Sequence, residues 1–215
     1  MFLTGPDEEF VPEHLRGQLA IVVVMVFTGP EAGARIAMAP MMGHGHLAEM
    51  IAEMPYADLN SSFDDPAGMR NYYSAEYLFD LPDEAIDRVC ARAGDMVVPS
   101  SSAIAMARQG GAVGDGPSGY PVPWRAASWI IHPLGIWDDP ADDERMITFT
   151  HNLCGDVAEW ATGSVYLNFI GDEGRARTIA GFGADNYERL VAVKDQYDPD
   201  NVFHHNHNIE PSLAR

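Results

Sequence analysis

Residues 186–211, NYERLVAVKDQYDPDNVFHHNHNIEP, carry the clearest structural information in the chain. Apolar residues recur at helical spacing at the start of this stretch, which predicts an amphipathic helix over 185–197. The helix is expected to end at Asp198-Pro199, because proline cannot continue a helix. A tail rich in Asn and His follows, and it could be a metal site, a cofactor cradle or a surface segment.

The histidines of the tail are the first candidates for a metal site. His204, His205 and His207 supply imidazole, which suits zinc or copper. Adjacent residues of an extended tail point to opposite sides, so only His205 and His207 share a face. No carboxylate or cysteine nearby completes a set of three or four ligands, and the GHGH of residues 43–46 has the same weakness. We therefore predict no metal site.

Composition bounds the class of protein. The 215 residues are 47% hydrophobic, which predicts a globular protein of one large or two small domains. The formal net charge is −19, with only 13 Lys and Arg residues. Neutralising phosphates requires clustered cations, so the charge argues against nucleic-acid partners and against adsorption to anionic membranes.

The cysteines and the N-terminus give expectations about compartment. Cys90 and Cys154 lack metal-type spacing and are expected to be small buried hydrophobes. The N-terminal MFLTGPDEEF has no basic or apolar signal region. The longest apolar run, 19–27, is far shorter than the ~20 residues of a membrane-spanning helix. We expect a cytoplasmic protein.

The hydrophobic pattern predicts an α+β fold, a mostly antiparallel β-sheet covered by helices. The run 19–27, LAIVVVMVF, is apolar on both faces and predicts a central buried strand. The other predicted strands are 96–98, 124–132 and 165–170, and the predicted helices are 31–41, 46–54, one following Asp80 and ending at Gly94, 145–162 and 185–197.

Two predicted strands carry candidate binding residues. Alternation in 124–132 places Arg125, Ala127 and Trp129 on one face, where Arg125 would bind an anionic or aromatic ligand or form an ion pair at a sheet edge. In 165–169, VYLNF, Tyr166 and Asn168 share a side. A buried Asn168 must be hydrogen-bonded, so it either holds a neighbouring loop or contacts a ligand.

The fixed spacing of residues 165–211 closely resembles the C-terminal end of berberine bridge enzyme-like flavin oxidases, within the vanillyl-alcohol oxidase group. Weaker similarity extends upstream through MPYADLN (54–60) and YYSAEYLFDLPDEAID (72–87), so it covers nearly the whole chain. The matching residues are Tyr166, Asn168, Asn186, Tyr187, Arg189, Leu190, Lys194, Asp198, Pro199, Asn201, Phe203, Asn206, Asn208 and Pro211.

The resemblance implies a substrate-binding α+β domain over 1–170 and a C-terminal segment over 171–215 that helps to close over FAD. The tail would then be part of a cofactor cradle, and its histidines would be variable. FAD is the implied cofactor. Tyr166, Asn168 and Asn208 are expected near the flavin, and Tyr120, Arg125 and Trp129 are expected to contact substrate.

Two departures from the resembled family matter for function. Its FAD-binding half has no counterpart in these residues, so we expect a stand-alone substrate domain that acts with a separate FAD-binding chain. Phe169 stands where some members have a tyrosine proposed as catalytic base, and phenylalanine has no proton to transfer. No catalytic residue is assigned by resemblance.

Two alternatives remain open at this point. The first is a flavin-independent lyase, isomerase or cyclase that uses the same pocket, with His132 or Asp115 beside Arg125 as the acid–base pair. The second is a non-catalytic binding module. In each case, the face that meets the flavin domain in the family would expose apolar surface, which predicts a homodimer or a separate FAD-binding subunit in contact with the helix 185–197.

Overall fold

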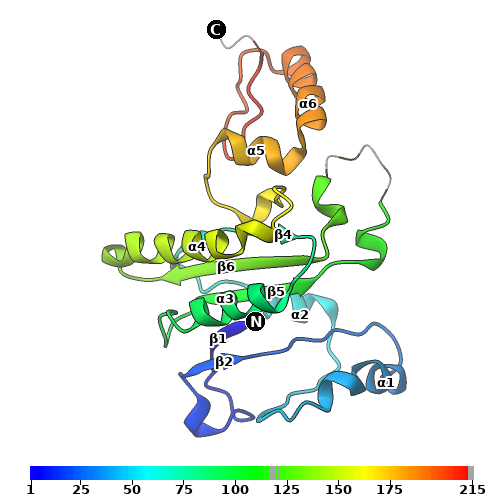
Figure 1. Cartoon of the computed structure of the whole chain (residues 1–215), viewed down its shortest axis with the longest axis vertical. Coiled ribbons are helices and arrows are strands. Elements are labelled where there is room, and N and C mark those ends of the chain that lie inside the picture. Colours follow the sequence, from blue (N-terminus) through cyan, green and yellow to red (C-terminus); the bar gives the residue numbers. More distant parts are fainter. Residues whose placement is uncertain (117–119, 121, 213–215) are drawn as a thin grey trace.

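The structure is a computed structural model that describes residues 1–116, 120 and 122–212. Its centre is a six-stranded sheet in which every pairing of named strands is antiparallel (Figure 1). The strand order is β2-β1-β5-β6-β3, and β4 also pairs with β6. The strands are β1 (Phe2–Thr4), β2 (Leu19–Ile21), β3 (Arg70–Tyr73), β4 (Glu76–Leu78), β5 (Ala103–Arg108) and β6 (Trp129–Trp137).

Helices cover one face of this sheet. Leu153 of α4 packs with Val89 of α3, Ile104 of β5 and Ile131 of β6 in one fully buried cluster, so both helices lie on the same side. Helices α5 and α6 and the C-terminal tail lie beyond the edge formed by β3 and β4 (Figure 1). The helices are α1 (Glu31–Met42), α2 (Tyr56–Ser61), α3 (Asp83–Ala93), α4 (Asp143–Val157), α5 (Arg175–Phe182) and α6 (Ala184–Tyr197). Short 3-10 helices occupy Glu13–Leu15, Gly111–Val113, Pro123–Ala126, Pro140–Asp142, Ala158–Trp160 and Leu167–Phe169.

The α+β prediction is confirmed, and so are several predicted helices. The helix predicted at 31–41 is α1, that at 185–197 is α6, and that at 145–162 corresponds to α4 and the following 3-10 turn. The predicted helix 46–54 is wrong, since α2 starts only after Pro55. Among the described residues, no helix is long and apolar enough to cross a membrane.

The prediction of a central buried strand at 19–27 is wrong. Only Leu19–Ile21 form a strand, and β2 lies at the edge of the sheet. The side chains of Ile21 and Val23 are 70% and 57% exposed. A β-branched run favours extended backbone, but burial on both faces requires layers above and below, which the edge of this sheet lacks.

Three other strand predictions need correction. Residues 96–98 form no strand, and 165–170 contain a 3-10 turn at Leu167–Phe169 instead of a strand. The strand predicted at 124–132 begins at Trp129, because residues 123–126 form a 3-10 turn that opens with proline. That strand continues to Trp137 through Pro133, although proline cannot donate to a ladder and is disfavoured in central strands.

β3 and β4 are two parts of one interrupted strand. Tyr73 pairs with Leu134 and Glu76 pairs with Ile131, so both parts follow a single register along β6. The interruption at residues 74–75 lies directly opposite His132 and Pro133. The amide of Ser74 still donates to the Pro133 carbonyl over 3.3 Å, but Pro133 has no N–H to return the bond.

Candidate functional site

The face of the sheet that points away from α3 and α4 carries the candidate site. Side chains alternate between the two faces of a strand. Ile131 of β6 points into the core beneath the helices, so the next residue, His132, points to the other face of the sheet. On the neighbouring strand β5, Ala105 pairs with His132, and Ala103 and Ala107 lie two residues to either side on the same face. We call this surface the His132 face; methyl groups are all that β5 presents there.

His132 is buried, with 7% of its surface exposed, and its tautomer follows from one contact. Its Nδ1 lies 2.9 Å from the carbonyl oxygen of Ser74. A carbonyl can only accept, so Nδ1 carries the hydrogen and Nε2 carries the lone pair. Among the described residues, Nε2 of His132 has no hydrogen-bond partner. Four other side-chain atoms in the described part of the chain are both unpaired and fully enclosed, and Nε2 is not among them, so it keeps some contact with solvent.

Burial decides the charge of this imidazole. Desolvation lowers the pKa of His132, and this effect outweighs the Ser74 carbonyl and the nearby charge of Asp65, which both raise it. The ring is therefore neutral at neutral pH and can accept a proton at Nε2.

Aromatic rings and one hydroxyl surround His132. Phe169 stacks on the imidazole with ring centroids 4.4 Å apart, and Tyr73 meets it edge-on at 5.8 Å. The Tyr73 hydroxyl donates to Asp65. Burial and then that hydrogen bond raise the pKa of Tyr73, so its hydroxyl stays protonated.

A row of aromatic rings continues from Phe169 toward the predicted flavin residues. Tyr166 lies 4.9 Å from Phe169 and 5.3 Å from Trp124 between ring centroids. The exposed Asn168 donates from Nδ2 to the Tyr166 hydroxyl over 2.7 Å. The two residues therefore do lie together, as the sequence predicted, but in a 3-10 turn and not on a strand.

The C-terminal tail reaches the same turn. His207 Nε2 lies 2.9 Å from the Leu167 carbonyl oxygen, so that nitrogen donates and the imidazole fastens the tail to residues 167–169. The next residue, Asn208, has an enclosed Oδ1 without a partner among the described residues. Tyr166 and Asn168 thus lie at one turn, Asn208 follows the residue that contacts this turn, and the contact of all three with flavin stays a prediction.

The three predicted substrate contacts do not gather. Arg125 donates from Nη1 to the Val113 carbonyl over 2.6 Å and packs against Gly116 in the β5–β6 connection. Trp129 packs against the core beneath α3 and α4, on the opposite face from His132. The expectation that Arg125 and Trp129 share a strand face is wrong, because Arg125 precedes the strand. Tyr120 is 61% exposed, in a loop of which residues 117–119 and 121 lie outside the described residues.

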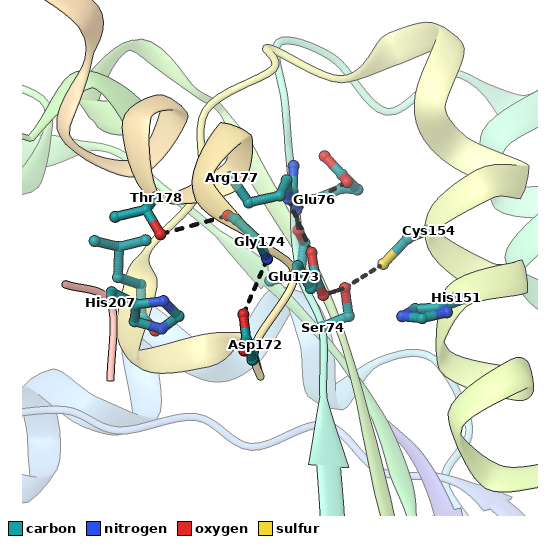
Figure 2. Close-up of polar contacts among 12 residues, drawn as sticks. Ser74, Glu76, His151, Cys154, Asp172, Glu173, Gly174, Arg177, Thr178 and His207 are labelled. Atoms are coloured by element: carbon teal, nitrogen blue, oxygen red, sulfur yellow. Dashed lines mark hydrogen bonds and ion pairs between the residues drawn. The ribbon is translucent and has the colours of Figure 1, made fainter. Parts of the chain in front are cut away.

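A second group of polar side chains lies at the β3–β4 edge, and sequence reasoning missed it (Figure 2). Ser74 donates from Oγ to Glu173 over 2.6 Å and accepts from the thiol of Cys154 at 3.3 Å. Arg177 contacts Glu173 at 2.9 Å and Glu76 at 3.0 Å, and it donates to the Ala75 carbonyl over 2.8 Å. We call Ser74, Glu76, Cys154, Glu173 and Arg177 the edge cluster.

The edge cluster borders an open pocket of about 420 Å³ that Tyr72, His151 and Asp172 also line. Burial raises the pKa of the Cys154 thiol to about 12, so this cysteine is no nucleophile at neutral pH. Burial also raises the pKa of Glu76, against the opposing effect of Arg177. The cluster therefore acts as a structural joint between the sheet and α5.

The prediction that both cysteines are buried is only half right. Cys154 is buried as predicted, whereas Cys90 on α3 is exposed. Its helix packs through Ala85, Val89 and Ala93, and Cys90 lies off that stripe. In the part of the chain that the structure describes, no group of three or more His, Cys, Asp or Glu side chains could hold a metal ion.

Comparison with known proteins agrees with the resemblance found in the sequence. Residues 165–210 match the family described as berberine and berberine-like. The C-terminal part of this chain is therefore similar in sequence to berberine and berberine-like proteins. That berberine-like segment includes the 3-10 turn, α5, α6 and the tail.

Two proteins with sequence similarity to this chain, one over part of it and one over most of it, are named as flavin enzymes. A VAO-type flavoprotein oxidase of Thermothelomyces thermophilus is 37% identical over 86 residues, 38% of this chain and 15% of that protein. An FAD-linked oxidoreductase of Pyricularia oryzae is 26% identical over 88% of this chain and 41% of its own length. The fold of 6-hydroxy-D-nicotine oxidase from Arthrobacter nicotinovorans superposes with a TM-score of 0.69 at 21% identity, covering 85% of this chain and 42% of that one. The chain thus matches less than half the length of each.

Proposed function

We propose that this chain forms the substrate-binding half of an FAD-linked oxidoreductase acting on a small molecule, and that a separate FAD-binding chain completes the enzyme. The observation that carries this proposal is the His132 face. A neutral imidazole with an unpaired Nε2 lies there, stacked on Phe169 at 4.4 Å. Phe169 adjoins Tyr166 and Asn168, which the resemblance assigns to the flavin.

The residues of this chain suit one end of FAD, the isoalloxazine ring. Asn208 Oδ1 has no partner among the described residues, and this acceptor suits an N–H donor such as the flavin ring provides once a shift of the tail uncovers it. The exposed carboxamide of Asn168 and the phenol of Tyr166 add polar atoms at the same turn. Bound FAD would supply the hydride acceptor for oxidation of a substrate carbon.

The phosphates of FAD find less support in this chain. Its 32 acidic residues outnumber its 13 basic ones, so the net field repels a pyrophosphate. The one glycine-rich G-x-G-x-x-G match, GDGPSG at 114–119, lies in the connection between strands β5 and β6 and not between a strand and an α-helix, which is the context that binds a pyrophosphate. Both features favour placing the phosphate site on the separate FAD-binding chain.

His132 would act as the general base in this proposal. Oxidation of an alcohol or amine removes a proton from oxygen or nitrogen while hydride leaves the adjacent carbon. The unprotonated Nε2 accepts that proton. Tyr73, held by its bond to Asp65, keeps free lone pairs and can accept a hydrogen bond from the substrate. Ala105 and Ala107 are the β5 neighbours of the imidazole on this face, so β5 places no bulky side chain against it.

A contact surface for the partner is also part of the proposal. On α6, Val193 and Tyr197 are 53% and 75% exposed, and Val202 and Phe203 in the tail are 67% and 81% exposed. Exposed apolar groups close together in the sequence suit burial against another chain. Either the FAD-binding chain or a second copy of this chain would cover them.

The test is an NMR titration with lumiflavin, which is the flavin ring without its phosphates. We expect chemical-shift changes at Tyr166, Asn168, Asn208 and His132, and an Asn208→Ala variant that binds lumiflavin at least about tenfold more weakly. Asn152→Ala, an exposed change on α4 on the other face of the sheet, is the matched control. Shift changes confined to other parts of the chain, or none up to millimolar lumiflavin, would overturn the proposal.

One observation favours a second candidate, a flavin-independent lyase, isomerase or cyclase. His132 and Tyr73 form a base and a hydrogen-bond acceptor on one face, with the phenol proton donated to Asp65. Such a pair can move protons without a redox cofactor. The lumiflavin titration separates the two, because this alternative needs no flavin contact at Asn168 or Asn208. A non-catalytic binding module would require neither the imidazole nor the phenol.

A further inference from the structure

Pro133 occupies a position where a central strand normally cannot accept proline. The carbonyl and amide groups of alternate residues in a strand point to opposite neighbours. The bond from the Ser74 amide to the Pro133 carbonyl, 3.3 Å long, shows that residue 133 faces the β3–β4 side. On the β5 side the ladder is unaffected, because residues 132 and 134 serve it. The cost of the proline therefore falls on one group, the Ser74 carbonyl.

The Ser74 carbonyl has a partner all the same. In an unbroken ladder it would accept from the amide of residue 133, which proline lacks. It accepts instead from His132 Nδ1 at 2.9 Å. The bond replaces the missing ladder donor with a side chain from the adjacent residue, so a buried carbonyl is not left unpaired.

We infer that Pro133 is a positioning residue: by withholding a backbone N–H, it reserves the Ser74 carbonyl for His132 and so fixes the imidazole in the Nδ1–H tautomer with Nε2 turned to the open face. An alanine at this position would supply an N–H that competes for the same carbonyl. His132 would then lose the acceptor that sets its tautomer and ring orientation. The role of Nε2 as base rests on the proposed function, whereas the tautomer does not.

The edge cluster supports this arrangement from the other side of the strand. The side chain of Ser74 is held by Glu173 at 2.6 Å, and the neighbouring Ala75 carbonyl accepts from Arg177 at 2.8 Å. Residues 74–75 therefore keep a fixed backbone although Pro133 cannot return the ladder bond. A rigid Ser74 carbonyl is what a single hydrogen bond needs in order to orient a ring.

The experiment measures the tautomer directly in the full chain. In wild type, ¹⁵N shifts of the imidazole should show a protonated Nδ1 and a bare Nε2, with a through-bond coupling between His132 Nδ1 and the Ser74 carbonyl carbon. In Pro133→Ala, we expect that coupling to disappear, the Nε2–H form to appear, and the backbone amide introduced by the substitution to be protected from exchange. Pro140→Ala, which removes an exposed proline elsewhere, should leave His132 unchanged.

Two results would overturn the inference. One is a wild-type His132 that carries its hydrogen on Nε2 or shows no coupling to Ser74, and this measurement needs no variant. The other is a folded Pro133→Ala protein that keeps the Nδ1–H tautomer. Neither readout involves flavin, so the inference can stand if the lumiflavin titration fails, and it can fail while lumiflavin binds.

Discussion

The guanidinium of Arg177 lies 3.0 Å from the carboxylate of Glu76, and this contact joins α5 to the edge strand of the sheet. The two side chains are only 21% and 12% exposed, so water screens the pair weakly. Glu173 shares the same guanidinium at 2.9 Å. One cation therefore balances two half-buried carboxylates.

Replacing Arg177 by Met should lower the free energy of unfolding by about 3 kcal/mol, because two carboxylates then lose their counter-charge. Urea unfolding measures the change. Arg145→Met is the matched control: its contact with Asp142 is 4.0 Å long and exposed, so the expected loss is at most about 0.5 kcal/mol. Equal losses in the two variants would show that the edge cluster does not stabilise the fold.

The lowered pKa of His132 predicts a pH-dependent stability. The unfolded chain takes up a proton at about pH 6.5, while the folded imidazole resists protonation until lower pH because it is buried. Between these values the unfolded state binds more protons, so the free energy of unfolding falls as pH falls below about 6.5. Glu76, whose folded pKa is raised, gives the opposite slope at lower pH.

A His132→Gln variant isolates this effect, since glutamine can still donate to the Ser74 carbonyl but does not titrate. We expect the stability difference between wild type and this variant to change between pH 7.5 and 5.5, with wild type losing more. Thermal unfolding at a series of pH values measures it. Parallel curves for the two proteins would mean that His132 is solvated and that its pKa is not lowered.

The two cysteines should differ sharply in reactivity. Cys90 is exposed on α3, whereas the Cys154 thiol is buried, donates to Ser74 and has a pKa of about 12. In the native protein at pH 8, iodoacetamide should label Cys90 and spare Cys154. Peptide mass spectrometry reads out both sites, and Cys90→Ser should leave the native protein unlabelled. Native labelling of Cys154 would show that the edge cluster opens readily.

The sequence predicted the fold class and part of the site for different physical reasons. The fixed spacing of residues 165–211 indicated the family fold, and local helical periodicity was enough for α1 and α6. The predicted strand at 19–27 failed because hydrophobicity does not reveal whether a layer lies above and below. The prediction that the strand ends at His132 was wrong. Pro133 is tolerated within β6 because the His132 side chain, and not a backbone amide, donates to the Ser74 carbonyl.

Long-range contacts explain the residues that were missed. Arg177 and the Ala75 carbonyl are 102 residues apart in the chain, so no local pattern links them. Tyr166 and Asn168 are two residues apart, and a short-range pattern could pair them. The site was therefore predictable where its residues share one turn, and unpredictable where the sheet edge brings distant segments together.

The surface of α6 and the tail should control assembly. If a second copy or an FAD-binding chain covers Tyr197 and Phe203, then Phe203→Lys should weaken association by about tenfold or more, since large buried aromatics dominate interfaces. Sedimentation equilibrium at micromolar concentration, alone and with the FAD-binding chain, measures this. Ile36→Lys on α1, equally exposed at 78%, is the control. A wild-type chain that stays monomeric under both conditions would contradict the proposed interface.

Asp198 should fix the C-terminal tail. Its carboxylate accepts from the Lys194 ammonium and from the amides of Val202 and Phe203, at 2.7 and 3.1 Å for the two amides. These bonds, led by the one from Lys194, lower the pKa of Asp198. The stabilisation is thus present above the unfolded pKa near 3.8 and is lost as pH falls through the lower folded value.

Replacing Asp198 by Ala should therefore speed amide exchange throughout residues 199–208 while leaving β6 protected. Hydrogen–deuterium exchange at pH 7 measures this segment by segment. Asp200→Ala is the matched control, because its exposed carboxylate has no hydrogen-bond partner among the described residues. If both variants exchange like wild type, the prediction is wrong. The contact between His207 and Leu167 would then hold the tail without help from Asp198.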